Sequence, residues 1–202
     1  YAEAYRQEFS ASAAGSYHLP NEHKNIYSDI NRKQYEQFSS CLSKDTKYLE
    51  VGCSFGGVLQ HVNSFGVNEA HVVEPNKSDA EYIRRSFPDV KVYNQPFEQA
   101  ALPADYFDVT SSFEVLEHIT NPGRFLKRMY RCAKPGALIN IEVPDHNDVL
   151  LRYYLDTNYH TFYYHKAHIH YFTKQSLEEL AGICGFTGKA RSFLMYPFFN
   201  HV

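Results

Sequence analysis

A glycine-spaced turn is the first group of residues whose types and spacing could carry chemistry. Gly52, Ser54 and Gly56 follow a short apolar run over residues 47–51 and precede what reads as the start of a helix. Such a turn exposes backbone N–H groups at the end of a strand, with the dipole of the next helix behind them. In an open α/β sheet a nucleotide-like ligand binds there, although a tight corner without ligand is the alternative. The spacing matches neither the dinucleotide pattern Gly-x-Gly-x-x-Gly nor a Walker loop.

A carboxylate ends the second apolar run. Glu74 follows His71-Val72-Val73, about twenty residues after the glycine turn. A carboxylate can accept hydrogen bonds from two vicinal hydroxyls, so an acid at this point suits the ribose of a nucleotide. The competing interpretation is an acid at the start of the next helix, near Pro75.

Histidines and tyrosines form the remaining group. His118 follows the fourth predicted strand, where an imidazole can accept a hydroxyl proton near neutral pH or can cap the next turn. Residues 144–173 hold further histidines and six tyrosines. Three interpretations of that segment stay open: a metal site, a catalytic base, or an aromatic lid that packs on itself. The ligands of the metal site would be Asp145, His165, His168 and His170.

The elements that must position these residues alternate along the chain. Strands separated by helices indicate βαβ units, right-handed crossovers and a mostly parallel sheet with helices on both faces. A chain of 202 residues fits one such domain, so we predict a doubly wound α/β fold. The predicted strands cover residues 46–51, 70–73, 90–93, 106–111, 137–143 and 189–199. The predicted helices cover residues 26–42, 58–65, 78–87 and 124–132, and a turn is expected at Lys134-Pro135-Gly136.

The order of these features resembles class I S-adenosylmethionine-dependent methyltransferases. The acid-x-Gly-x-x-x-Gly turn that begins at Glu50, the acid after the second strand, and the blocks LPADYFDVTSSFEVLEHITNP and KPGALINIEVP match the family's motifs in order. The resemblance covers residues 48–144 and resumes over 168–186. It implies S-adenosylmethionine as cofactor and a seven-stranded-type Rossmann-like sheet. Because the sequence ends near the first of the family's closing antiparallel strands, we expect the last strand to be missing or to pair differently.

The resemblance implies a cofactor site residue by residue. The glycine turn, Ser112 and Phe113 would line the methionine part, the acid after the second strand would hold the ribose, and the loop after the third strand would cover the adenine. Cys53 is expected to be a small residue that admits the cofactor rather than a nucleophile. Many relatives carry an Asp where Asn94 or Gln95 stands. The predicted cofactor residues are Glu50, Gly52, Cys53, Ser54, Gly56, Glu74, Pro75, Asn94, Gln95, Phe97, Ser112 and Phe113.

The segment HIHYFTKQSLEELAGICGF over residues 168–186 is similar to a stretch of quinone-pathway and sugar O-methyltransferases and of deoxysugar C-methyltransferases. In those groups the matching histidine faces the substrate, which implies His168 as the catalytic base, with His118 second. The deoxysugar group has a Glu just before that histidine where this chain has Ala167, and this chain lacks that group's N-terminal cysteine zinc module. We assign no metal ligand. The predicted substrate contacts are Asp145, Tyr164, His165 and His170.

Composition narrows the class of protein. Lys+Arg 20 against Asp+Glu 23 gives a net charge of −3, so no basic field points to a nucleic acid. No apolar run approaches the ~20 residues of a membrane span. The four cysteines are scattered without a Cys-x-x-Cys pair, which favours reduced thiols and a cytoplasmic protein. The oligomeric state is not written in the sequence.

Together these patterns predict a helical cap or lid over residues 1–45 and a methyltransferase domain over 46–202, with a substrate lid inserted at about 145–172. The predicted reaction transfers a methyl group to a hydroxyl of a small molecule. A sugar, a glycan or a phenolic ring is favoured, because aromatic side chains stack on such surfaces. The alternatives are a module that binds the cofactor without catalysis and a C-methyltransferase on a keto-sugar. Glycine spacing disfavours a nicotinamide oxidoreductase, and the charge balance disfavours RNA methylation.

Overall fold

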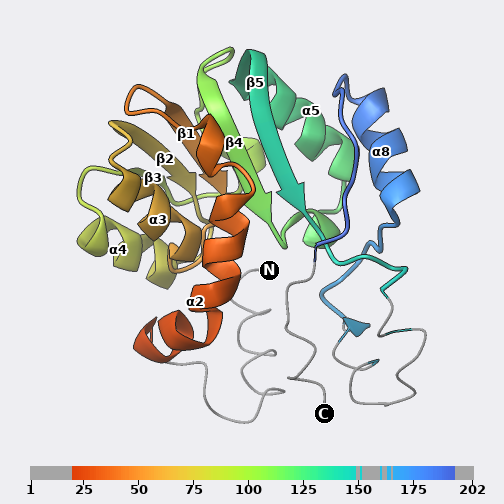
Figure 1. The fold of residues 1–202 in the computed structure, drawn as a ribbon, viewed down its shortest axis with the longest axis horizontal. Coiled ribbons are helices and arrows are strands. Elements are labelled where there is room, and N and C mark those ends of the chain that lie inside the picture. The colour runs from red at the N-terminus through yellow and green to blue at the C-terminus, as the bar shows by residue number, and fades with distance from the viewer. Residues whose placement is uncertain (1–19, 149–150, 152–159, 161–162, 165, 194–202) are drawn as a thin grey trace.

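A parallel β-sheet is the centre of the molecule (Figure 1). The computed structural model describes residues 20–148, 151, 160, 163–164 and 166–193. Within them, five parallel strands pair in the order β3-β2-β1-β4-β5. The strands are β1 (Lys47–Val51), β2 (Glu69–Val73), β3 (Lys91–Tyr93), β4 (Phe107–Phe113) and β5 (Ala133–Glu142). The helices are α2 (Pro20–Glu36), α3 (Gly57–Phe65), α4 (Lys77–Ser86), α5 (Pro122–Cys132) and α8 (Lys174–Ile183), with 3₁₀ turns η1 (Ser39–Cys41), η2 (Phe97–Gln99) and η3 (Leu116–His118).

Helices cover both faces of the sheet. Side chains of a strand alternate between its faces, so neighbouring residues of β1 enter different cores. Tyr48 packs in the same buried cluster as Leu59 of α3 and Ile83 of α4. Leu49 joins the other cluster, which contains Phe125 of α5 and receives side chains of α8. This arrangement confirms the doubly wound α/β fold predicted from the alternation of elements.

The five strands lie within a few residues of their predicted positions, and β5 differs most. It was expected to begin at Ala137 after a Lys-Pro-Gly turn, but it begins at Ala133. Its pairing with β4 shifts register between Ala133 and Leu138, and Gly136 there has a φ of +81°. The Lys-Pro-Gly sequence therefore forms an irregularity inside the strand. The described part of the strand predicted over 189–199, residues 189–193, has no regular secondary structure.

Local sequence explains where the helices begin and end. The predicted C-cap Gly66 ends α3 in the left-handed conformation at φ +87°, which costs glycine little. The side chain of Asn121 accepts a hydrogen bond from Arg124 N at 2.9 Å, with Pro122 in the first turn of α5. Thr173 and Ser176 form a capping box at the start of α8. Of these two helices, α5 packs against β5 and α8 packs against α5.

The segment before β1 is helix followed by a short 3₁₀ turn rather than one helix over 26–42. It ends in the core, since Phe38 is fully buried and its ring stacks on Tyr48 with ring centroids 5.7 Å apart. Tyr35 stacks on His61 of α3. Residues 1–19 of the predicted cap lie outside the described residues, and the boundary at residue 45 stays a prediction.

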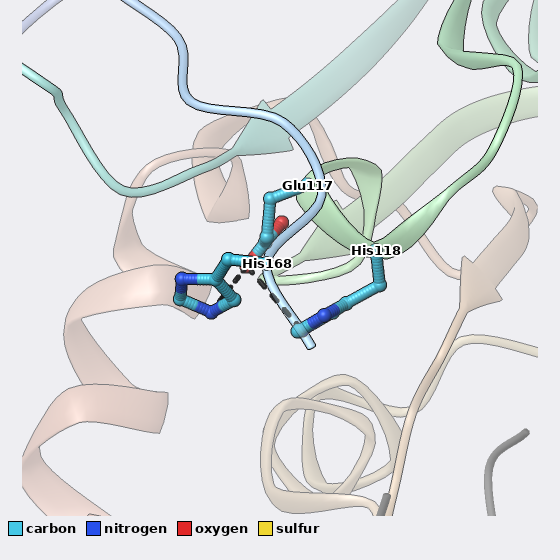
Figure 2. Close-up of side chains that lie close together, drawn as sticks. All are labelled: Glu117, His118 and His168. Atoms are coloured by element: carbon cyan, nitrogen blue, oxygen red, sulfur yellow. Dashed lines mark ion pairs between the residues drawn. The ribbon is translucent and has the colours of Figure 1, made fainter. Parts of the chain in front are cut away.

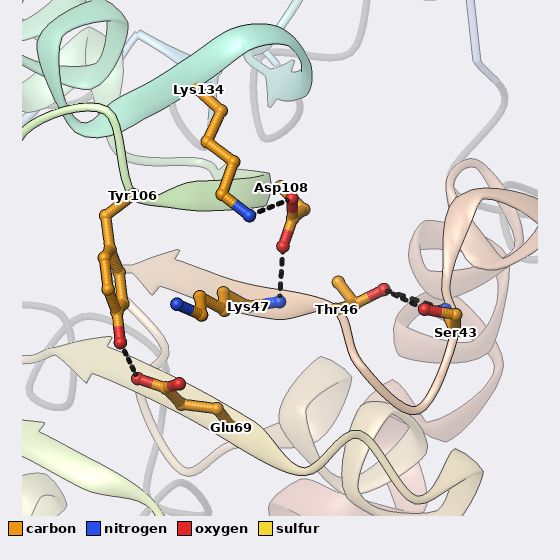
Figure 3. A network of polar contacts seen from close by, with 7 residues as sticks. All are labelled: Ser43, Thr46, Lys47, Glu69, Tyr106, Asp108 and Lys134. Atoms are coloured by element: carbon orange, nitrogen blue, oxygen red, sulfur yellow. Dashed lines mark hydrogen bonds and ion pairs between the residues drawn. The ribbon is translucent and has the colours of Figure 1, made fainter.

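A polar network links the amino ends of the strands (Figure 3). Asp108 accepts hydrogen bonds from the backbone N of Lys47 at 2.9 Å and from Nζ of Lys134 at 2.6 Å. Tyr106 donates to Oε1 of Glu69 at 2.6 Å. Lys134 of the Lys-Pro-Gly sequence thus serves strand pairing at the end of the sheet away from the glycine turn. No helix among the described residues is long and apolar enough to cross a membrane.

Candidate active site

The glycine turn after β1 adopts backbone conformations that favour glycine. Gly52 has φ +79° and Gly56 φ +75°, and Ser54 between them also lies in the left-handed region at φ 49°. A Cβ on Gly52 would lie 2.4 Å from Cγ2 of Val115, in the loop after β4. Conformation and space together therefore make any side chain at Gly52 costly.

The turn borders a large cavity at the carboxyl ends of the strands. The cavity has a volume of about 2090 Å³ and extends along β5 to α8. Its lining includes Gly52 and Ser54 after β1, Glu74 after β2, Phe113 at the end of β4 and Asp145 after β5. Crevices at this edge of an open α/β sheet are where ligands bind.

Glu74 is tied to the turn. One of its carboxylate oxygens accepts from Ser54 N at 2.8 Å and the other from Asn76 N at 2.9 Å. The side chain is only 5% exposed, yet it borders the cavity. Each carboxylate oxygen has a second lone pair, so Glu74 can hold the turn and still accept from a ligand hydroxyl.

Glu50 lies behind the turn as a buried carboxyl group. Its pKa is raised to about 8, chiefly by burial; a hydrogen bond from Tyr48 opposes this shift, and the neighbouring Glu74 adds to it. The Tyr48 hydroxyl lies 3.1 Å from Oε2 of Glu50 and 2.5 Å from Oγ of Ser111. Burial also raises the pKa of Cys53 well above the ordinary value, so this residue is a thiol at neutral pH. Its state agrees with a packing role rather than a nucleophilic one.

The predicted adenine residues fall into two sets. Phe97 and Pro75 line the cavity, together with Pro96 and Glu98, which the sequence did not single out. The amides of Asn94 and Gln95 bond to backbone carbonyls instead, and neither residue is part of the cavity lining. Asn94 Nδ2 donates to the carbonyls of Glu74 and Pro75, and Gln95 Nε2 donates to that of Gln99.

Of the two predicted residues at the end of β4, Phe113 lines the cavity and Ser112 does not. Phe113 lines the cavity from the end of β4, and its ring lies near that of Phe38. Ser112 is almost fully buried and donates to the carbonyl of Val51 at 3.2 Å, which ties β4 to β1. The Ser112 side chain is thus engaged within the sheet, and the expected cofactor contact, which is made largely through backbone, stays a prediction.

The predicted substrate residues are spread over the segment after β5. Asp145 lines the cavity and pairs with Phe172 in an isolated β-bridge. Tyr164 is 42% exposed, and neither it nor His170 lines the cavity. His165 lies outside the described residues. Tyr163, which the sequence did not single out, is buried and faces the cavity.

His118 and His168 come together beside Glu117 (Figure 2). Their ring centroids are 4.9 Å apart, although they come from η3 and from the segment before α8. Nδ1 of His118 lies 2.8 Å from the carbonyl O of Ala167, and Nδ1 of His168 lies 3.1 Å from that of Tyr163. A carbonyl only accepts, so each Nδ1 carries the hydrogen and each neutral ring has its lone pair at Nε2. Burial lowers the pKa of His118, which favours the neutral ring.

Glu117 is the residue that both histidines approach. Its Oε1 lies 3.7 Å from Nε2 of His118 and 3.9 Å from Nε2 of His168. Its side chain is 1% exposed, and burial raises its pKa to about 8. The Glu117 carbonyl accepts from the backbone N of Ile169 and of His170, which docks the loop that carries His168.

More carboxyl groups line the same part of the cavity. Glu142, at the end of β5, accepts from the side chains of Gln34 in α2 at 2.6 Å and of Gln37 at 2.8 Å. Burial and the neighbouring Glu117 and Glu142 raise the pKa of Glu114 well above the ordinary value. The sequence did not assign these acids. The signal for Glu114 and Glu117 was present, because both stand beside His118 in the Glu-Val-Leu-Glu-His sequence.

The structure is a parallel Rossmann-like sheet in which a glycine turn follows the first strand and an acid follows the second. This combination is typical of a class of nucleotide-binding α/β proteins. A comparison with known families agrees, since residues 23–189 match the model described as methyltransferase domain. The chain belongs to this family of S-adenosylmethionine-dependent methyltransferases.

Curated relatives match about half of the chain. A probable S-adenosylmethionine-dependent methyltransferase of Mycolicibacterium smegmatis is 25% identical over 112 residues, 52% of this chain and 40% of that protein. A ubiquinone biosynthesis O-methyltransferase of Caulobacter vibrioides is 32% identical over 96 residues, 45% of this chain and 38% of that protein. A sterol 24-C-methyltransferase of Neurospora crassa is 27% identical over 108 residues, 50% of this chain and 28% of that protein. The chain thus spans well under two thirds of the length of these relatives.

Solved structures share the fold. A S-adenosylmethionine-dependent methyltransferase of Thermotoga maritima superposes with a TM-score of 0.62 at 24% identity, covering 83% of this chain and 77% of that one. A phosphoethanolamine N-methyltransferase of Haemonchus contortus, solved with S-adenosylmethionine, gives a TM-score of 0.63 at 20% identity, covering 78% of this chain and 36% of that one. At these identities the likeness establishes the fold, and the acceptor has to be argued from the site.

Proposed function

We propose that the protein transfers a methyl group from S-adenosylmethionine to a hydroxyl of a small molecule that carries a sugar or a phenolic ring. The observation that carries this proposal is the position of two histidines. His118 and His168 line the same cavity as the glycine turn, and each has its Nδ1 engaged by a backbone carbonyl.

The residues of the cavity fit the cofactor. Gly52 lines the cavity without a side chain, which suits a ligand that comes close to the main chain. Glu74 offers carboxylate lone pairs to the two ribose hydroxyls. The carboxyl groups of Glu50 and Glu114 face a ligand whose sulfonium and ammonium groups are cationic. A cation held there favours the ionised form of both acids.

Transfer needs positioning and removal of one proton. S-Adenosylmethionine supplies an electrophilic methyl group, and the new C–O bond forms as the C–S bond breaks and leaves a neutral thioether. Holding the acceptor oxygen in line with the methyl group supplies much of the rate acceleration. A neutral Nε2 of His168 or His118 accepts the hydroxyl proton. General-base catalysis of this kind typically accelerates a reaction by roughly 10²–10⁴.

Tyrosines beside the histidines favour a flat or ring-shaped acceptor. The rings of Tyr163 and Tyr171 stack with centroids 5.9 Å apart, and Tyr164 lies 5.0 Å from Tyr171. Tyr163 is the one of these that lines the cavity. Aromatic faces stack on sugar and phenolic rings while hydroxyls bond the rim. The name of the Caulobacter relative also records O-methylation.

Methylation of carbon is the second candidate, because the Neurospora relative is named a sterol 24-C-methyltransferase. The sequence raised this alternative for a keto-sugar acceptor, with Ala167 and the lack of a cysteine zinc module against it. A module that binds the cofactor without catalysis is the third. Cytoplasmic location stays a prediction from the unpaired cysteines.

Methyl transfer to a panel of phenols and sugars distinguishes these candidates. The purified chain is incubated with S-adenosylmethionine labelled in its methyl group, and products are located by mass spectrometry and carbon NMR. The proposal predicts a methyl ether with one acceptor class. It also predicts that His168→Gln lowers kcat/KM by roughly 10²–10⁴ and leaves cofactor affinity within about twofold.

His146→Asn is the matched control, since His146 is an exposed histidine of the same segment and does not line the cavity. It should leave transfer unchanged. A methyl group on carbon would favour the second candidate. No transfer to any acceptor by protein that binds the cofactor would favour the non-catalytic module.

A further inference from the structure

Three ligand-type atoms converge in the cavity from two separate segments (Figure 2). Oε1 of Glu117 and Nε2 of His118 and His168 all lie within 4.8 Å of one another. A cation with bonds of about 2.1 Å would place tetrahedral neighbours about 3.4 Å apart. The observed separations of 3.7 Å and 3.9 Å from Glu117 exceed that value by a few tenths of an ångström, which small ring rotations can close.

Both imidazoles are oriented as metal-binding histidines are. A ligating histidine donates its other ring N–H to a carbonyl or carboxylate, which fixes the tautomer and points the lone pair at the ion. Here Nδ1 of His118 is held by Ala167 O and Nδ1 of His168 by Tyr163 O. The Nε2 atoms are therefore the ones directed at Glu117.

Glu117 supplies an independent observation. Both of its carboxylate oxygens are buried, and neither receives a hydrogen bond from any part of the chain that the structure describes. An ionised carboxylate buried without hydrogen bonds costs several kcal/mol, so this group needs either a proton or a cation. The cluster lines the cavity, so such a cation can reach it.

We propose that Glu117, His118 and His168 bind one divalent transition-metal cation, of which Zn²⁺ is the most suitable. Two imidazole nitrogens and one carboxylate suit Zn²⁺, Fe²⁺ or Co²⁺ better than Mg²⁺ or Ca²⁺, which prefer oxygen ligands. Three protein ligands leave at least one coordination position open, as in catalytic rather than structural sites.

The inference rests on the proposed function and refines its proton transfer. An acceptor hydroxyl that binds the open position becomes more acidic, as metal-bound water does. It releases its proton to water, and the resulting oxygen anion forms the C–O bond while the C–S bond of the cofactor breaks. With the ion bound, the histidines are ligands and no longer the base.

Calorimetric titration of the chelator-treated chain with Zn²⁺ tests the site directly. One Zn²⁺ should bind per chain, and Glu117→Gln and His168→Gln should each weaken binding by at least tenfold. His146→Asn should bind as the wild type does. Co²⁺ in place of Zn²⁺ should give the visible absorption of a low-symmetry site, and this absorption should vanish in Glu117→Gln. Far-UV circular dichroism of each variant verifies the fold.

Absence of Zn²⁺ binding by the folded wild type, or equal affinity in Glu117→Gln, would overturn the inference. Methyl transfer measured in parallel separates it from the proposed function. Full activity in the metal-free chain would refute the role of the ion in proton transfer and leave transfer by a histidine base intact. Activity that requires the added ion and is lost in Glu117→Gln would support both.

Discussion

At the scale of single residues, burial and hydrogen bonding decide the protonation of the acidic side chains in the cavity. Glu50 lies near the end of β1 and Glu74 directly follows β2, yet Glu74 receives two backbone N–H groups while Glu50 receives one hydroxyl. Hydrogen bonds to the charged form compensate the desolvation of a carboxylate. Glu50 has few of them and therefore holds its proton to about pH 8.

The stability of the protein without cofactor should therefore depend on Glu50. Its pKa rises from an ordinary 4.5 to about 8 on folding, so between those values the folded state binds more protons than the unfolded state. The free energy of unfolding then falls as the pH rises through this window. Glu50→Gln removes the effect, so its Tm should fall less than that of the wild type between pH 5 and pH 8.

Thermal denaturation across this pH range provides the measurement. Glu81→Gln is the control, because the side chain of Glu81 is 53% exposed in α4. Its Tm should follow that of the wild type. If Glu50→Gln and wild type keep the same pH dependence, the buried carboxyl group does not titrate as described.

At the scale of elements, the part of the segment directly before β1 packs into the domain core. Phe38 is fully buried against Tyr48 and Phe113, and Gln34 and Gln37 bond to Glu142 at the end of β5. The segment thus connects the sheet core to the wall of the cavity.

Removal of the Phe38 ring should lower the stability of the protein substantially, because this ring is fully buried. Phe38→Ala is expected to lower the free energy of unfolding by about 3–5 kcal/mol, through lost burial and the cavity left behind. Phe65→Ala, at a ring that is 42% exposed at the end of α3, should change it by at most about 1 kcal/mol. Urea denaturation measures both. Similar values for the two variants would mean that the segment packs independently of the core.

Elements were easier to predict from the sequence than contacts between them. Short apolar runs and glycines such as Gly66 located the five strands and the ends of α3, α4 and α5 to within a few residues, because these signals are local. The helix before β1 was predicted six residues too late, and α8 was not predicted. The pairing of Glu117 with His168 was not predictable, since it depends on how the loop at Ile169 docks on Glu117. Asn94 shows the same limit, because its amide is used by backbone carbonyls that only the fold brings near.

At the scale of the molecule, the two ends of the sheet carry different groups of residues. The amino ends hold a network of paired charges around Asp108 that ties strands together. The carboxyl ends hold the glycine turn, buried acids and the histidine pair around one cavity. The network that ties the strands together and the residues proposed for methyl transfer therefore lie at opposite ends of the sheet, and ligands of open α/β sheets bind at the carboxyl ends.

Calorimetric titration with S-adenosylmethionine and with NAD tests the central claim, that the glycine turn binds the methyl donor. We expect micromolar binding of S-adenosylmethionine and none of NAD. Gly52→Ala should weaken binding by at least tenfold (about 1.4 kcal/mol), because its Cβ meets Val115 in the turn. Gly66→Ala is the control, because Gly66 has a similar positive φ of +87° but an added Cβ would have no atom within 4 Å. This variant should bind S-adenosylmethionine as the wild type does. Failure of the folded chain to bind S-adenosylmethionine, or equal affinity in Gly52→Ala, would contradict the account.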